Sequence, residues 1–156
     1  MKIFFIFLIL SASSYAQYQN VMISSLSNPN EPSICINPKN PYQIVAGANI
    51  NKVYRSTDGG LTWTTSILTS SVYGVWGDPC IIVDTNEVFY YFHLSNPPAG
   101  SWIDRIVCQK STNVGFSWNE PGSYTYLHPQ KNQDKEWAVV DPATNNIYVT
   151  WTEFDS

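Results

Sequence analysis

The chain has 156 residues, and 8 Lys and Arg residues against 12 Asp and Glu residues give it a net charge of −4 at pH 7. Nucleic-acid-binding proteins need a basic face, so this mildly acidic balance argues against a nucleic-acid partner. The composition is poor in charge and rich in aromatic residues, Asn, Ser and Pro, which favours an extracellular all-β protein.

Residues 1–16 have the features of a signal peptide. Lys2 supplies a positive charge, residues 3–10 form an apolar run too short to span a bilayer, and residues 14–16 offer a cleavage site. No later stretch is long and apolar enough for a membrane helix. We therefore expect an exported chain, secreted, periplasmic or at the cell surface, with no membrane span after cleavage.

The rest of the chain predicts short strands and no helix, because Pro and Asn recur and no helical periodicity is visible. The first strand is expected over residues 18–24. A pattern then returns three times: an acidic residue, a short apolar strand, a turn and a second strand. The acidic residues are Glu31, Asp78 and Glu136, and the second strands are expected at 44–48, 88–93 and 147–151. Near-continuous apolar runs of this kind fit strands buried on both faces.

In the first two units a third strand, at 53–56 and at 106–111, enters a turn of the form Ser-x-Asx-x-Gly-x-x-Trp. A side-chain oxygen at the Asx position can accept backbone N–H bonds across the turn, and the glycine can take a positive φ. The tryptophan opens a fourth strand and can fold back under the turn as a plug. The defining residues are Ser56, Asp58, Gly60 and Trp63 in the first turn, and Ser111, Asn113, Gly115 and Trp118 in the second.

These turns resemble the Asp box of the bacterial neuraminidase repeat, found in sialidases and related secreted β-propellers. The first turn matches at every defining position, while Asn113 replaces the aspartate in the second. The resemblance implies that the turns are structural and lie on the face away from the active site. Four antiparallel strands in a repeat of about fifty residues describe a propeller blade.

The predicted fold is therefore all-β: a partial β-propeller of four-stranded antiparallel blades over residues 31–156. This range holds about two and a half blades, where six are expected in a full-length parent. Residues 17–30 would contain the closing strand of the last blade. We interpret the chain as a fragment of a longer protein, with an open array of blades as the alternative.

Strand parity predicts where a catalytic or binding site could lie. A unit of four alternating strands returns the chain to its starting side, so Glu31, Asp78 and Glu136, with Asp134 nearby, should converge on the face opposite Asp58 and Asn113. A rim of aromatic residues should surround them. Its expected members are Trp76, Trp102, Tyr124 and Tyr126, with His128. Such a site could be a glycosidase carboxylate pair, a calcium site or a sugar-binding cleft, or the acids could fix blade packing.

The cysteines and histidines carry little signal for catalysis. Cys35, Cys80 and Cys108 are odd in number, so one disulfide is possible but its pairing is not specified. His93 and His128 belong to no recognisable ligand pattern, so no metal site is predicted from them. No cofactor is expected, apart from calcium as a possibility at the acids.

The resemblance to sialidases does not extend to their catalytic residues. Their first inner strand carries an Arg-Ile-Pro sequence where this chain has Asn30-Glu31-Pro32, and their acid aspartate corresponds to the stretch Asn49-Ile50-Asn51. Arg55 and Arg105 are the only arginines. The predicted function is therefore an exported sialidase-like repeat protein, part of a glycan-acting glycoside hydrolase and inactive as given. The alternative is a non-catalytic propeller that binds carbohydrate or protein.

Overall fold

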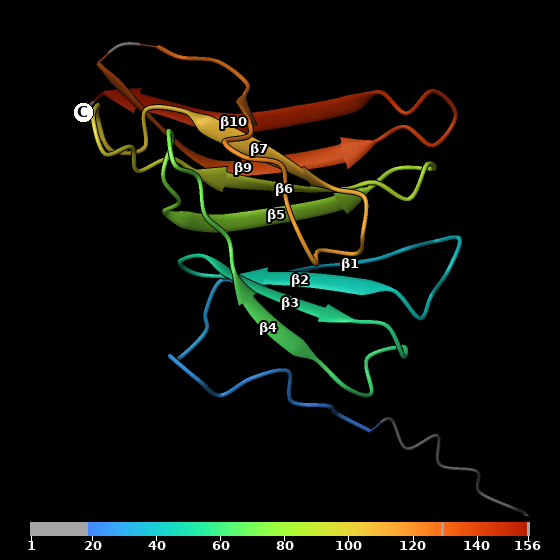
Figure 1. The fold of residues 1–156 in the computed structure, drawn as a ribbon. Helices are drawn as coiled ribbons and strands as arrows, with labels where there is room; N and C mark the ends of the chain where they lie inside the picture. Colours follow the sequence, from blue (N-terminus) through green and yellow to red (C-terminus); the bar gives the residue numbers. More distant parts are fainter. Residues whose placement is uncertain (1–18, 129, 156) are drawn as a thin grey trace, which may run out of the picture.

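The computed structural model describes residues 19–128 and 130–155. The expected signal peptide lies outside the described residues. Within them the chain is all-β, with ten strands in antiparallel sheets and no helix (Figure 1).

The first sheet contains four strands in the order β1-β2-β3-β4. They are β1 (Ser33–Ile36), β2 (Ile44–Ala48), β3 (Lys52–Ser56) and β4 (Thr64–Ile67). The strand expected at 44–48 is confirmed to the residue, and all of β2 is buried. β4 begins directly after Trp63, as the turn motif predicts.

The second sheet repeats this order with β5-β6-β7-β8. Its strands are β5 (Gly77–Val83), β6 (Phe89–Leu94), β7 (Ile106–Ser111) and β8 (Ser123–Tyr124). The expected strands match β5, β6 and β7 closely. The fourth strand, in contrast, starts later than the tryptophan at which we expected it and is short. Residues between Trp118 and Ser123 include Pro121, which has no N–H to give to a ladder.

The third sheet is a hairpin of β9 (Lys131–Val140) and β10 (Ile147–Asp155). Both strands are longer than expected, because residues 131–134 of β9 pair with residues 152–155 of β10 beyond a register shift at Thr150/Thr152. The expectation that the inner strand starts at Glu136 is therefore wrong. Its first half is polar and has no apolar pattern by which a strand would be recognised.

The strand expected over residues 18–24 is also absent from the described part of this segment. Residues 19–32 are turn or irregular, and β1 is the first strand of the described chain. A strand needs a neighbour for its backbone hydrogen bonds. Within the first sheet, β2 and β3 each lie between two other strands. Only the edge strands β1 and β4 could pair with residues 19–30, and neither does.

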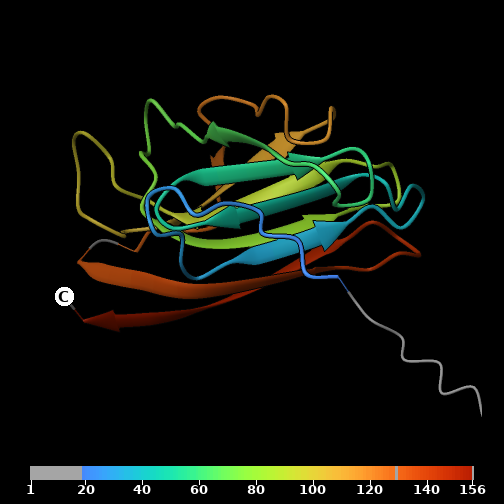
Figure 2. The same cartoon turned by 90° about the horizontal axis from the view of Figure 1, so that it is seen from below.

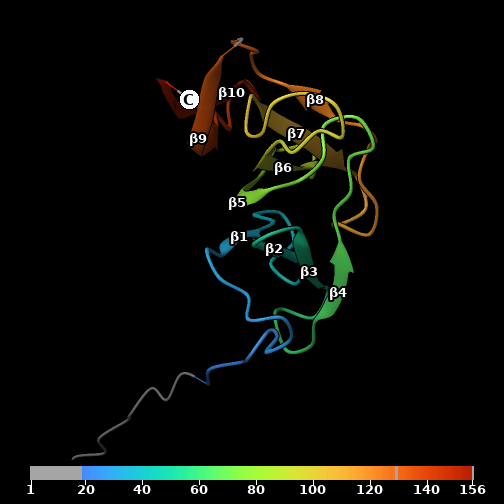
Figure 3. The ribbon, with the colours of Figure 1, turned by 90° about the vertical axis from the view of Figure 1, so that its left-hand side faces the viewer.

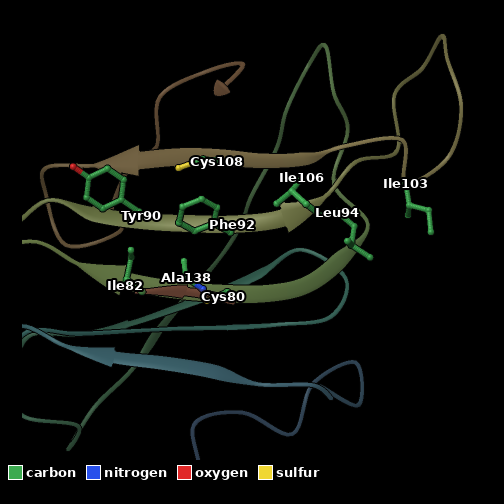
Figure 4. Packing of buried hydrophobic residues seen from close by; sticks show 9 residues of the cluster. All are labelled: Cys80, Ile82, Tyr90, Phe92, Leu94, Ile103, Ile106, Cys108 and Ala138. Atoms are coloured by element: carbon green, nitrogen blue, oxygen red, sulfur yellow. Dashed lines mark hydrogen bonds between the residues drawn. The ribbon is translucent and has the colours of Figure 1, made fainter. Parts of the chain in front are cut away.

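The three sheets lie one above another, and their first strands run along the same side of the stack (Figure 3). β1 packs against β5, and β5 packs against β9. One apolar cluster joins the second and third sheets; its members include Phe92, Ile106 and Ala138 (Figure 4). Another cluster, with Val45, Val53 and Tyr91, joins the first and second sheets. Side-chain packing between sheets thus fixes their order.

Most strands lie along one common direction, with the connections gathered at the two ends (Figure 2). The turns from β1 to β2, from β5 to β6 and from β9 to β10 share the right-hand end in Figure 1. Ser56 pairs with Ile44, which pairs with Ile36 at the end of β1, so the turn after β3 is at this end too. In the second sheet Ser111 is aligned in the same way with Phe89 and Val83. We call this the turn end, and the opposite end, where β1 and β5 begin, the acid end.

The three cysteines are free thiols. Cys80 and Cys108 are buried in the cluster of the second and third sheets. Burial raises the pKa of the Cys108 thiol to about 12. The backbone N–H of Ala138 donates to Cys80 Sγ at 3.2 Å, so this sulfur contributes to the contact between sheets.

Candidate functional site

The first turn, residues 56–63, is held by a network that centres on two side-chain oxygens. Ser56 Oγ donates to Asp58 Oδ1 at 2.7 Å and accepts the N–H of Gly60 at 2.8 Å. Thr62 donates twice to the same carboxylate, from N to Oδ1 at 3.0 Å and from Oγ1 to Oδ2 at 2.6 Å. Trp63 folds back, as expected, and its Nε1 donates to Gly60 O at 2.9 Å.

The carboxylate of Asp58 is stabilised in its ionised form. Its pKa is lowered to about 2, first by the Thr62 hydroxyl and backbone N–H and then by Ser56. Within the described part of the chain, the hydrogen bonds of Asp58 are all internal to the turn. These contacts favour the structural role that the sequence resemblance implies.

The second turn, residues 111–118, repeats most of the network with an amide in place of the carboxylate, but Trp118 Nε1 has no partner among the described residues. Ser111 Oγ donates to Asn113 Oδ1 at 2.9 Å and accepts from Gly115 N at 2.9 Å. Ser117 N donates to the same Oδ1 at 2.9 Å. The last bond is reversed, because Asn113 Nδ2 donates to Ser117 Oγ at 2.8 Å, whereas Thr62 donates to Asp58.

At the acid end the structure brings the three predicted acids together. A pocket of about 220 Å³, which we call the acid pocket, is lined by Glu31, Pro32, Asp78, Pro79, Lys135, Glu136 and Trp137. The predicted convergence of Glu31, Asp78 and Glu136 away from Asp58 and Asn113 is thereby confirmed. A catalytic role for any of them stays a prediction.

The expectation that Glu136 is equivalent to Glu31 and Asp78 is wrong. Glu31, Asp78 and Lys135 each have a left-handed backbone, with φ of 48°, 50° and 55°. Each is followed at the same distance by an Asx residue whose Oδ1 accepts the N–H two residues further on; these residues are Asn37, Asp84 and Asp141. Lys135 is therefore the third member of the repeat, and Glu136 stands where the other two units have Pro32 and Pro79.

Lys135 ties Glu31 and Asp78 to each other. Its Nζ lies 2.8 Å from Asp78 Oδ2 and 3.6 Å from Glu31 Oε1. Asn49 holds the same two residues from the other side, because its Oδ1 accepts Asp78 N at 2.7 Å and its Nδ2 donates to Glu31 Oε2. Sequence reasoning missed both Lys135 and Asn49. The spacing of Lys135 from Asp141, matched to the other two units, could have identified the lysine.

The carboxyl groups at this end have pKa values shifted in opposite directions. Burial acts to raise the pKa of Asp78, but hydrogen bonds with Glu31, Lys135 and Asp134 outweigh it, so the net shift is downward. Burial and the hydrogen bond with Asp78 raise the pKa of Asp134. The hydrogen bond with Asp78 raises the pKa of Lys135, which stays an ammonium.

Glu136 is the most unusual acid of the pocket. Its residue is 4% exposed, and neither carboxyl oxygen has a hydrogen-bond partner among the described residues. Burial raises its pKa to about 8, with smaller contributions from Asp78 and Asp134. Loss of solvent is thus the larger cause of this rise, and the charges of the neighbouring acids are the smaller one. A carboxyl group with a raised pKa thus shares the acid pocket with one whose pKa is lowered.

The aromatic residues predicted for the rim divide into two groups. Trp76 and Trp102 meet edge to face, with ring centroids 5.8 Å apart, and line a second pocket of about 230 Å³. This tryptophan pocket also contains Asn49 and Asp134, and it shares Glu31, Asp78 and Lys135 with the acid pocket.

Tyr124 and Tyr126 lie outside both pockets. Tyr124 stacks edge to face on Tyr73, and the Arg105 guanidinium lies 5.1 Å and 5.4 Å from the two rings. Tyr126 contacts His128, whose Nδ1 lies 2.8 Å from Glu153 Oε1. These residues hold the segment that leads to β9 in place. Of the four predicted rim residues, only Trp76 and Trp102 line a pocket with the acids, and Trp137, which was not predicted, lines the acid pocket.

The structure gives no support for the calcium alternative. Among the described residues, no group of three or more Asp, Glu, His or Cys side chains is arranged to hold a metal ion. Lys135 supplies the positive charge that Glu31 and Asp78 would otherwise recruit. His93 is fully buried between Leu94 O and Gln109 Oε1, and burial lowers its pKa to about 4, so it belongs to the core.

Comparison with models of protein families, with curated proteins and with solved structures finds no match to this chain. Within residues 19–128 and 130–155 there is no apolar helix of the length needed to cross a membrane. The interpretation of the site consequently depends on its own geometry.

Proposed function

We propose that this chain is part of an exported β-propeller of the Asp-box type that acts on glycans as a sialidase-like glycoside hydrolase, and that the acid end is its glycan site. The repeated four-stranded order of the first two sheets supports the propeller interpretation, as does the alignment of β1, β5 and β9. The matching networks of the two turns support the Asp-box interpretation.

One observation carries the glycan function: carboxyl groups with oppositely shifted pKa values lie in adjoining pockets beside two exposed tryptophans. Glycoside hydrolysis uses one protonated and one ionised carboxyl group on either side of the scissile bond. Glu136, with a pKa near 8, has the protonation state of a general acid at neutral pH. Asp78 has that of the ionised partner.

Sialidase activity of the chain itself is not expected. A sialic acid carries a carboxylate that sialidases hold with arginines, and neither Arg55 nor Arg105 lines the two pockets. Arg105 is bound to Asp104 at 2.6 Å, and Arg55 lies over the Phe116 ring of the second turn. Any sialidase chemistry therefore requires residues outside this part of the protein.

A second candidate, glycan binding without hydrolysis, is favoured by the positions of the same acids. Glu136 is 4% exposed, and Lys135 occupies the space between Asp78 and Glu31. A buried acid reaches a glycosidic oxygen only if the pocket opens. Binding needs no such change, because the tryptophans are already exposed.

Two measurements on the full-length parent, rather than on this chain alone, test the function. Binding to a glycan microarray should be retained by Asp58→Asn, at the turn end, and weakened by Asp78→Asn, at the acid end. Release of fluorophore from a panel of aryl glycosides then separates the two candidates. Hydrolysis that is lost in Glu136→Gln identifies the hydrolase, and binding without hydrolysis identifies the second candidate. Failure to bind any glycan would contradict both.

A further inference from the structure

We infer that the tryptophan pocket is a subsite for an uncharged pyranose ring, held by stacking on Trp102 and Trp76 and by hydroxyl donation to the neighbouring carboxylates. This inference rests on the proposed glycan function and adds the class of sugar. It differs from what the sialidase resemblance implies, which is an anionic sugar.

The two tryptophans offer an aromatic surface that the core does not use. Trp76 is 38% exposed and Trp102 is 50% exposed, although their rings touch edge to face. An edge-to-face pair leaves the face of one ring free, and the negative potential of that face attracts the C–H groups of a sugar. The pocket beside them, of about 230 Å³, is open to solvent and lined by both rings.

The segment that presents Trp102 is anchored on both sides. Ile103, the next residue, is buried, and its N–H donates to Ser95 O at 3.0 Å while its carbonyl accepts from Gln133 N at 2.8 Å. Trp76 N donates to Leu94 O at 2.9 Å. Both rings therefore start from backbone that is fixed to the second and third sheets. Binding then needs little ordering of the protein, which favours affinity.

The charges in the pocket select against an anionic sugar. Glu31, Asp78 and Asp134 line it, and Lys135 is the one cationic side chain among its lining residues. The lysine is already paired with Asp78 and Glu31. A ligand carboxylate or sulfate would meet an excess of negative charge with no free guanidinium. Hydroxyl groups of a neutral sugar can instead donate to carboxylate oxygens, and these bonds are stronger than those to neutral acceptors.

A separate observation indicates that this end of the sheets is built for a ligand. Glu136, in the adjoining acid pocket, is 96% buried (4% exposed) and has two oxygens with no partner among the described residues. Buried polar groups are nearly always hydrogen-bonded, so a buried carboxyl group without partners requires an explanation, and a ligand hydroxyl at this end would supply one.

The test compares neutral oligosaccharides with their sialylated and sulfated counterparts on one microarray, followed by titration calorimetry of the strongest neutral ligand. We expect neutral sugars to bind and their anionic counterparts to bind more weakly. Trp102→Leu should weaken the neutral ligand about tenfold or more, as loss of an aromatic contact at a binding site does. Trp102→Phe, which keeps an aromatic face, should retain most of the affinity.

Phe116→Ala is the matched control, because Phe116 is an exposed aromatic residue at the turn end. It should leave the affinity unchanged, and thermal melting confirms that each variant is folded. Preference for anionic sugars, or neutral binding that survives Trp102→Leu, would overturn the subsite while the glycan function stands. Absence of binding to every glycan would overturn both together.

Discussion

Asp58 and Glu136 lie at opposite ends of the sheets, and their carboxyl groups have opposite environments. Asp58 accepts hydrogen bonds from Ser56 and from both the backbone and hydroxyl of Thr62, and its pKa is lowered to about 2. Glu136 is buried with no hydrogen-bond partner in the described chain, and burial raises its pKa to about 8. The hydrogen bonds of the Asp58 carboxylate stabilise its turn, whereas the Glu136 carboxyl group makes no hydrogen bond within the described chain.

The backbone does not share this contrast. Left-handed residues other than glycine lie at both ends, with Glu87, Val114 and Asn145 in turns of the turn end and Glu31, Asp78 and Lys135 at the acid end. The two ends therefore differ in how their carboxyl groups are bonded. The difference teaches that the turn end uses its carboxylate to hold its own turn, while the acid end contains carboxyl oxygens with no partner in the described chain.

The largest expected difference concerns the tryptophans at the two ends. Trp118 packs against Tyr91, with ring centroids 5.6 Å apart, in the cluster that joins the first two sheets. Trp118→Ala should reduce the free energy of unfolding by about 3 kcal/mol or more, as large-to-small changes in a core do. Trp102→Ala, at an exposed residue, should cost less than about 1 kcal/mol. Urea denaturation of both variants measures this, and equal losses would contradict the assignment of stability to the turn end.

The second prediction uses the pH dependence of Glu136. Its folded pKa is raised from 4.5 to about 8, so its contribution to stability is complete below pH 4.5 and is lost as the pH rises to about 8. Glu136→Gln removes this dependence. Relative to the wild type, the variant should gain stability between pH 5 and pH 7, on the order of 2–3 kcal/mol, because one proton contributes about 1.4 kcal/mol per pH unit in this range.

Denaturation curves of the two proteins at several pH values test it, with Glu153→Gln as the control at an exposed position. If the free energies of unfolding of the wild type and of Glu136→Gln change with pH in the same way, the Glu136 carboxyl group ionises normally. The contrast with Asp58 would then be contradicted.

Much of the sheet order could be predicted from the sequence, because apolar runs mark buried strands whatever their neighbours are. The runs at 44–48 and 106–111 match β2 and β7 without error. β9 was predicted too short, since its first half, Lys131–Lys135, contains no apolar residue. That half is a strand because it pairs with the end of β10, and a pairing of this kind leaves no trace in hydropathy.

The site could be predicted only in part, for a different reason. Strand parity places residues at one end of a sheet, but it does not fix which of two adjacent residues faces a given way. Glu136 was therefore assigned the position that Lys135 occupies, and the ion pairs of Lys135 were missed. Asn49 was missed because its role depends on contacts with Glu31 and Asp78, which are far from it in the sequence.

The third prediction separates two ion pairs on β9. Lys135→Met removes the ammonium from Asp78 and Glu31, and should lower the free energy of unfolding by about 1 kcal/mol or less at neutral pH, because the lysine is largely exposed. Lys131→Met is the matched control, since its partner Asp155 is 87% exposed. It should have almost no effect.

The pKa of Asp78 should rise in Lys135→Met, so stability should be lost at a higher pH on acidification than in the wild type. Added salt should reduce the difference between wild type and variant. A larger effect of Lys131→Met than of Lys135→Met would contradict the proposed organisation of the acid end.

The smallest expected effect comes from exchanging the two Asx residues of the turns. Asp58→Asn should change stability little at pH 7, because Thr62 can accept from an amide as Ser117 accepts from Asn113 Nδ2. The pH dependence should change instead. The lowered pKa of Asp58 gives stability that is present above the unfolded value near 3.8 and is lost as the pH falls toward 2. Asp58→Asn should reduce this loss of stability at low pH, and Asn113→Asp should increase it. Melting temperatures between pH 2 and pH 6 measure both changes. If Asn113→Asp does not change the loss of stability at low pH, the two turns differ in their electrostatics although their side-chain hydrogen bonds are similar.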